Sequence, residues 1–209
     1  MFLLDELFPG LSTVEDQVVP DFPDRTEPWG VLGQGGSGIM EQILNLTGKE
    51  DGVFIHPSSK IGDFVQIEGP SYIGKNAEIR HGALIRKGSW ICEDAVVGHS
   101  SEIKNSILLP GAKAPHFNYV GDSILGFDSN IGAGAKISNV RNDGRTVLVT
   151  MKDGTRIDSG LRKFGALVGD NSHLGCNVVT NPGAIIEPGS MIRPNDTVTG
   201  WIGLSPQNP

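Results

Sequence analysis

Histidines and cations in the middle of the sequence recur at spacings that could support chemistry. His81, His99 and His116 follow one another at nearly equal intervals, and Arg86 and Lys104 are separated by the same interval as His81 and His99. Imidazoles act as general bases and metal ligands near neutral pH, whereas paired cations bind phosphate or carboxylate groups. Whether these side chains meet in space depends on the elements that carry them.

An internal six-residue repeat supplies those elements. A helix would move its apolar positions with a period of 3.6 residues, so a sustained step of six excludes an amphipathic helix. Small or restricted residues tend to fall four positions after each aliphatic residue. Three such hexapeptides, each pointing one aliphatic side chain inward, form the sides of one triangular coil. The aliphatic positions are Ile55, Ile61, Ile67, Ile73, Ile79, Ile85, Ile91, Val97 and Ile103.

The repeat predicts an all-β fold, a left-handed parallel β-helix. Its step slips by one residue near Leu108 and again at Leu125, stops at residues 141–163, and resumes from Val168 to Val198. Within the break, alternating residues at 146–151 precede Lys-Asp-Gly and then Thr-Arg-Ile. This pattern predicts a β-hairpin arm that protrudes from the prism and could embrace a neighbouring subunit.

The first part of the chain differs from the rest. Residues 1–52 lack the six-residue step, contain four prolines and include a candidate helix at about 38–46. We interpret them as an N-terminal cap or linker, because an uncovered first coil would expose an apolar edge. The expected domains are this cap and a β-helix at 53–209 with the hairpin insertion at 141–163.

Composition excludes several classes of partner. The 24 acidic and 17 basic residues give a net charge of −7, which argues against binding to nucleic acid or a membrane surface. No segment approaches the roughly 18 apolar residues of a transmembrane helix, so we expect a soluble, cytoplasmic protein. Cys92 and Cys176 show no ligand-like spacing and are expected to be reduced thiols.

Stacked coils convert spacing into columns on the prism. Residues separated by three hexapeptides, or by one residue fewer across a slip, lie above one another at about 4.8 Å. Arg86 and Lys104 would then repel unless an anion lies near them; the alternative is two solvated side chains, one paired with Glu68. The histidine column allows a metal site, a general base or a merely structural row. A straight row suits tetrahedral metal coordination poorly.

A resemblance to a known family starts at residues 113–122, Lys-Ala-Pro-His-Phe-Asn-Tyr-Val-Gly-Asp, and continues through Asn-Ile-Gly-Ala-Gly at 130–134 and Asn139. These motifs resemble the acetyltransferase domain of the bifunctional N-acetylglucosamine-1-phosphate uridyltransferase/glucosamine-1-phosphate acetyltransferase. They also resemble the β-helical C-terminal domain of sugar-1-phosphate nucleotidylyltransferases. Both are left-handed β-helices of hexapeptide repeats, and the resemblance covers roughly residues 55–200.

The resemblance implies roles for particular residues. His116, the histidine of the His-x-x-Tyr segment, would be the catalytic general base. Backbone N–H groups near Gly132 to Gly134 could approach a developing oxyanion. No metal ligand is implied. The sugar phosphate would contact Arg86, Lys104, Tyr119 and Asn130, and the acetyl-CoA groove would be lined by Ala133, Asn139 and Cys176.

The implied function is N-acetyl transfer from acetyl-CoA to a hexosamine 1-phosphate, either glucosamine or galactosamine 1-phosphate, by a homotrimer. One alternative is a non-catalytic subunit that binds a nucleotide sugar or assembles with a separate nucleotidylyltransferase, whose catalytic half has no counterpart in this sequence. A second is a zinc hydratase like the γ-class carbonic anhydrases, which are also β-helices. Gly165 stands where the family has a lysine, and Lys163 lies two residues earlier, so the acceptor stays open.

Overall fold

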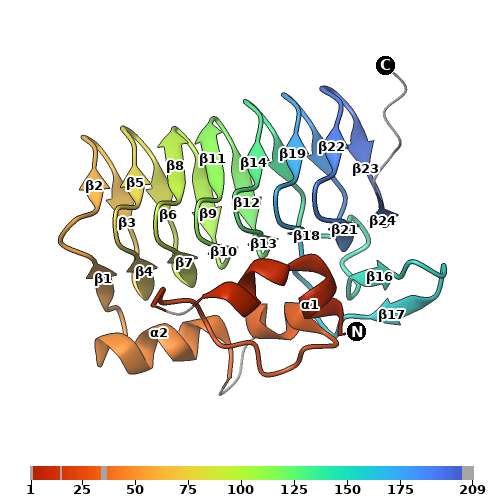
Figure 1. Cartoon of the computed structure of the whole chain (residues 1–209), viewed down its shortest axis with the longest axis horizontal. Helices are drawn as coiled ribbons and strands as arrows, with labels where there is room; N and C mark the ends of the chain where they lie inside the picture. The colour runs from red at the N-terminus through yellow and green to blue at the C-terminus, as the bar shows by residue number, and fades with distance from the viewer. Residues whose placement is uncertain (1, 15, 34–36, 204–209) are drawn as a thin grey trace.

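The hexapeptide repeat folds as a prism with three sheets along its sides. The computed structural model describes residues 2–14, 16–33 and 37–203. In the repeat region, coil after coil adds a short strand to sheet A (eight strands), sheet B (seven) and sheet C (seven), all paired in parallel (Figure 1). The predicted fold class, an all-β parallel β-helix of the left-handed hexapeptide type, is confirmed.

The strands of the three sheets contain two to four residues each. Sheet A consists of β1 (Val53–Ile55), β4 (Ser71–Ile73), β7 (Ser89–Ile91), β10 (Ile107–Leu108), β13 (Ile124–Leu125), β18 (Ala166–Val168), β21 (Ala184–Ile186) and β24 (Trp201–Ile202). Sheet B consists of β2 (Lys60–Ile61), β5 (Glu78–Ile79), β8 (Val96–His99), β11 (Lys113–His116), β14 (Asn130–Ile131), β19 (His173–Leu174) and β22 (Met191–Ile192). Sheet C consists of β3 (Gln66–Ile67), β6 (Leu84–Ile85), β9 (Glu102–Lys104), β12 (Tyr119–Gly121), β15 (Lys136–Ile137), β20 (Val179–Thr180) and β23 (Thr197–Val198).

Burial explains why the six-residue step specifies this prism. The aliphatic residue of each hexapeptide points into the interior, as Ile79 and Ile85 do with no exposed area. The small residue four positions later, such as Ala83, is buried at the corner. Ile85 pairs with Ile103, three full hexapeptides on, whereas Ile103 pairs with Val120, which is one position short of that interval. The predicted phase slip is therefore a one-residue shortening of a coil that leaves the interior column intact.

The N-terminal segment covers sheet A and not the end of the first coil, where Val53, Phe54 and Ile55 stay exposed. It contains α1 (Leu3–Leu7), η1 (Pro9–Thr13), η2 (Pro28–Leu32) and α2 (Ile39–Thr47), which lie along one side of the prism in Figure 1. Trp29 packs on Phe164 with ring centroids 5.8 Å apart, in a second apolar core outside the prism. Among the described residues, no helix could span a membrane. The domain boundary at residue 52 stays a prediction.

Helix α2 forms where the sequence predicted a helix. Ile39 and Ile43 lie one turn apart and are fully buried, so one face of the helix packs on the protein. The helix ends at Thr47 and is capped by Gly48, which has a left-handed conformation and donates its N–H to the carbonyl oxygen of Leu44.

The predicted hairpin arm is present, and its base is part of the core. Strands β16 (Leu148–Thr150) and β17 (Arg156–Asp158) pair antiparallel and extend beside the last coils in Figure 1. Val147 and Val149 are fully buried. Lys152 at the turn forms an ion pair with Glu187 at 2.6 Å. The arm is thus fixed at a defined angle to the prism.

Asp170 joins the cap to the prism. Its carboxylate accepts hydrogen bonds from the backbone N–H of Gly10 in η1 and of Phe127 in the prism, both at 2.8 Å. Its own N–H donates to the carbonyl of Leu7 at 3.0 Å. Burial raises the pKa of the Asp170 carboxyl to about 6, although the two N–H groups partly oppose the shift.

We expect this carboxyl to make stability depend on pH. Its folded pKa of about 6 lies above the unfolded value of about 3.9, so the folded state holds the proton more tightly and loses up to about 3 kcal/mol of stability as pH rises from about 4 through about 6. Urea unfolding of the protein and of Asp170→Asn at several pH values isolates this contribution as the difference between the two curves. Parallel curves would contradict the expectation.

Candidate functional site

The buried carboxylate of Asp122 contacts several of the predicted site residues at the edge of sheet C where its strands end. Lys104 Nζ lies 2.9 Å from Oδ2 and 3.0 Å from Oδ1 of Asp122, whose side chain is only 4% exposed. The amides of Asn105 and Asn139 also donate to this carboxylate. Asn139 donates in addition to the Tyr119 hydroxyl at 3.3 Å. Sequence reasoning did not single out Asp122, although it lies in the segment that carries the family resemblance.

Arg86 and Lys104 are neighbours, as the column predicted, and both have carboxylate partners. The register of Ile85 with Ile103 places the residues that follow them on adjacent strands. Arg86 lies 2.9 Å from Glu102 and 3.9 Å from Glu68. The alternative pairing of Arg86 with Glu68 is therefore present, and the carboxylates of Glu102 and Asp122 reduce the repulsion between Arg86 and Lys104. An anion site at these cations stays a prediction.

Tyr119 connects the two edges of sheet C. It lies three residues after His116, at the start of β12, and its hydroxyl reaches Asn139 near the other edge. A side chain at Gly121 would lie 2.6 Å from that hydroxyl, so glycine is what lets the ring lie across the sheet. Burial raises the pKa of the Tyr119 phenol above its ordinary value.

The histidine column lies at the opposite corner, between sheets B and C. The rings of His81 and His99 lie 5.5 Å apart, and Phe64 and Phe117 pack edge-on at either end of this pair. His99 Nδ1 is 2.9 Å from the His81 carbonyl oxygen. These two histidines therefore form an aromatic ladder on the surface, and no group of three or more His, Cys, Asp or Glu in the described part of the chain is placed to hold a metal ion.

His116 continues the column but differs from the other two in its support. It pairs with His99 in the sheet and is exposed to solvent. Its backbone N–H donates to Oδ1 of the buried Asn118 at 2.9 Å, and Asn118 donates in turn to the Gly132 carbonyl at 2.7 Å. The peptide that carries His116 is thus fixed while the imidazole is free to meet a ligand.

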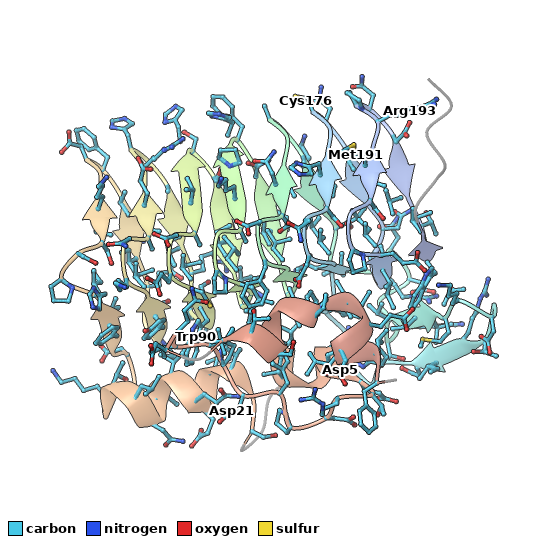
Figure 2. The ribbon with its side chains drawn as sticks, in the orientation of Figure 1. Asp5, Asp21, Trp90, Cys176, Met191 and Arg193 are labelled. Carbon is cyan, nitrogen blue, oxygen red and sulfur yellow. The ribbon has the colours of Figure 1, made fainter. Side chains whose placement is uncertain are left out.

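Ala133 and Cys176 lie at the same corner as His116, on successive coils. Gly134 donates to the His116 carbonyl at 3.0 Å, and Asn177 donates to the Ala133 carbonyl at 2.9 Å. Figure 2 shows Cys176 at the edge of the prism that lies away from the cap. Two of the residues predicted to contact acetyl-CoA, Ala133 and Cys176, therefore lie at the same corner as the predicted general base, His116.

Two predicted residues lie elsewhere within one chain. Asn130 begins β14 on sheet B, where it pairs with Lys113 and His173, so it is not beside the cations of sheet C. Asn139 belongs to the Asp122 cluster and not to the corner with Ala133 and Cys176. Apart from Asn130, the predicted residues thus form a corner group (His116, Ala133 and Cys176) and an edge group (Arg86, Lys104 and Asn139) on either side of sheet C, with Tyr119 between them.

Comparisons with known proteins identify relatives for most of the chain. The family model of the GMPPB C-terminal domain matches residues 67–162. A bifunctional sugar-1-phosphate nucleotidylyltransferase/acetyltransferase of Sulfurisphaera tokodaii is 39% identical over 198 residues, covering 86% of this chain and 47% of the relative. The bifunctional protein GlmU of Methanococcus vannielii is 38% identical over 185 residues, covering 82% and 43%. The chain is a homologue of the bifunctional GlmU-type proteins.

The predicted resemblance to this family is confirmed, with a limit on how much is matched. The chain spans about half the length of the curated GlmU-type relatives it matches. The matched share of this chain exceeds what residues 53–209 alone would give, so part of the cap has a counterpart in the relative from Sulfurisphaera tokodaii.

Solved structures with a related shape are more distant. A hexapeptide transferase family protein from Anaplasma phagocytophilum is 17% identical, with 73% of this chain and 76% of that one covered and a TM-score of 0.37. A mutant of perosamine N-acetyltransferase from Caulobacter crescentus, in complex with CoA and GDP-perosamine, is also 17% identical, with 73% and 50% covered and a TM-score of 0.34.

Proposed function

We propose that the protein is an acetyl-CoA-dependent N-acetyltransferase that acts on a hexosamine 1-phosphate, with His116 as the general base. The observation that carries the proposal is the bridge made by Tyr119 between the His116 corner and the Lys104–Asp122 edge. With this arrangement, the amine of the acceptor would lie at the His116 corner and its phosphate at the Lys104–Asp122 edge. The similarity to GlmU-type proteins over this region supports the same reaction class.

The chemistry is a direct transfer. His116 takes a proton from the hexosamine amine, whose nitrogen attacks the thioester carbonyl of acetyl-CoA. A new C–N bond forms, the C–S bond breaks, and the CoA thiolate takes up the proton from the imidazolium. An imidazole, with an ordinary pKa of about 6.5, can carry out both transfers near neutral pH.

Of the three backbone N–H groups at residues 132–134, one is free to donate a hydrogen bond to the oxyanion. Gly132 donates to the Leu174 carbonyl at 2.7 Å and Gly134 to the His116 carbonyl at 3.0 Å, so both are occupied. Within the described ranges, the N–H of Ala133 between them has no such acceptor. We therefore narrow the expected oxyanion contact to Ala133, on the same corner as the base.

A neighbouring subunit would complete this site. Asn130 on sheet B and the cations on sheet C face different sides of one prism, so a single chain does not bring them to one sugar phosphate. In a homotrimer with three-fold symmetry, sheet B of one subunit can approach sheet C of the next. The alternative partner is a separate nucleotidylyltransferase, because the relative from Sulfurisphaera tokodaii is named a bifunctional sugar-1-phosphate nucleotidylyltransferase/acetyltransferase.

The decisive experiment measures release of CoA thiol from acetyl-CoA with glucosamine 1-phosphate or galactosamine 1-phosphate as acceptor. We expect release that depends on the acceptor and yields an N-acetylated sugar phosphate by mass spectrometry. Release no faster than hydrolysis of acetyl-CoA with both acceptors would overturn the proposal. Binding of a nucleotide sugar without turnover would instead favour an assembly or binding subunit.

A further inference from the structure

A groove of about 990 Å³ lies between the cap, the edge of sheet C and the base of the arm. Leu32 and Met40 line it from the cap, Lys87 and Lys104 from the prism, and Arg162 from the arm. It shares Lys104 and Asp122 with the edge group. It does not include the His116 corner, whose Cys176 lies at the edge of the prism away from the cap (Figure 2).

The groove is strongly cationic for an acidic protein. Four cations line it, Lys87, Lys104, Arg162 and Lys163, against the single carboxylate of Asp122, which is already paired with Lys104. In the part of the chain that the structure describes, the other three have no acidic partner. The protein as a whole carries a net charge of −7, so this positive potential is local.

The walls of the groove are fixed by specific contacts. Asn105 Nδ2 donates to the Leu32 carbonyl of the cap at 2.9 Å. The cap lies against the arm here, because a Cβ added at Gly33 would lie 3.3 Å from a methyl carbon of Leu161. The packing of Trp29 on Phe164 joins the same two segments. The groove is therefore built by three segments that hold one another in place.

The lining also has an apolar part. Leu32, Met40, Val140 and Leu161 contribute hydrocarbon surface beside the cations. A ligand that matches both parts needs several negative charges and an attached flat or apolar group. A sugar monophosphate has too little charge for three unpaired cations and too little volume for the groove.

We propose that this groove binds a nucleoside diphosphate, either free or linked to a sugar. Lys87, Arg162 and Lys163 would hold the diphosphate, with Arg162 able to contact two oxygens at once. The base would lie against Leu32, Met40 and Leu161. The inference does not depend on acetyl transfer at His116.

Calorimetric titration of the full chain with UDP, with ADP and with inorganic phosphate tests the proposal. We expect one diphosphate bound per chain and weaker binding of phosphate. Lys87→Gln and Arg162→Gln should each weaken UDP binding by about tenfold, because each removes a charge-assisted contact. Arg156→Gln is the matched control, since Arg156 belongs to the same arm but lies outside the groove.

Three results would overturn the proposal. They are no binding of UDP or ADP at about 1 mM, equal affinity for phosphate and UDP, or an equal effect of Arg156→Gln and Arg162→Gln. The thiol-release assay separates this proposal from the proposed function. A chain that binds UDP but transfers no acetyl group would support the groove proposal and contradict the proposed function. A chain that transfers an acetyl group but binds no diphosphate would contradict the groove proposal alone.

Discussion

Replacing His116 with alanine should lower kcat of acetyl transfer to a hexosamine 1-phosphate by about 10²- to 10⁴-fold, the usual contribution of a general base. Stability should change little, because the side chain is exposed and the structural contacts of His116 run through its backbone to Asn118 and Gly134. Thiol release at saturating acceptor measures the first effect, and thermal unfolding measures the second.

His99→Ala is the matched control for His116→Ala. It removes the same side chain one strand away in the same column. The His99 ring packs against His81 and Phe117, so its loss should affect the surface ladder and leave kcat near that of the unmodified protein. An equal loss of kcat in both variants would show that the column acts as a unit, and full activity of His116→Ala would exclude it as the base.

The prism could be predicted because its fold repeats one rule. A six-residue step of buried aliphatic side chains fixes both the strand and the turn, and stacking then fixes which residues are neighbours. The contact of the His99 strand with the His116 strand and the adjacency of Arg86 and Lys104 follow from that rule without any tertiary information. Local periodicity and global packing agree in this part of the chain.

The parts that escaped prediction depend on exceptions to the rule. The column rule, with one residue fewer across the slip, predicts Gly121 and not Asp122 as the neighbour of Lys104. Gly121 is indeed the residue that pairs with Lys104 in the sheet. Asp122 reaches the lysine because it adopts a left-handed conformation with φ of 49°, which turns its side chain back toward the edge. The groove escaped for another reason. Its cap wall has no periodicity, so its position follows only from long-range packing such as Trp29 on Phe164.

Asp122→Asn should destabilise the protein by about 3–5 kcal/mol, as expected when one partner of a buried ion pair loses its charge. Lys104 is only 16% exposed and would keep a charge without a counter-ion. The new amide would keep only one accepting oxygen, so its NH2 group would face Lys104 and either Asn105 or Asn139, all of which are donors. Urea unfolding monitored by circular dichroism measures the loss.

An exposed aspartate provides the comparison. Asp143 forms an ion pair with Arg141 at 2.6 Å on the surface, and Asp143→Asn should change stability far less than Asp122→Asn. Both substitutions remove one charge from an ion pair and preserve side-chain shape. A difference between them therefore reports burial and the three donors around Asp122. Equal losses would contradict the assigned role of Asp122.

The double variant Lys104→Met, Asp122→Asn decides which property of Asp122 matters. If the unpaired lysine charge causes most of the loss, removing that charge as well should recover a large part of the stability, because an apolar side chain of similar length tolerates burial. Acetyl transfer should remain impaired in the double variant, since Asn139 and Tyr119 would still lack the carboxylate that positions them. No recovery of stability would assign the loss to the hydrogen bonds of Asp122 instead of its charge.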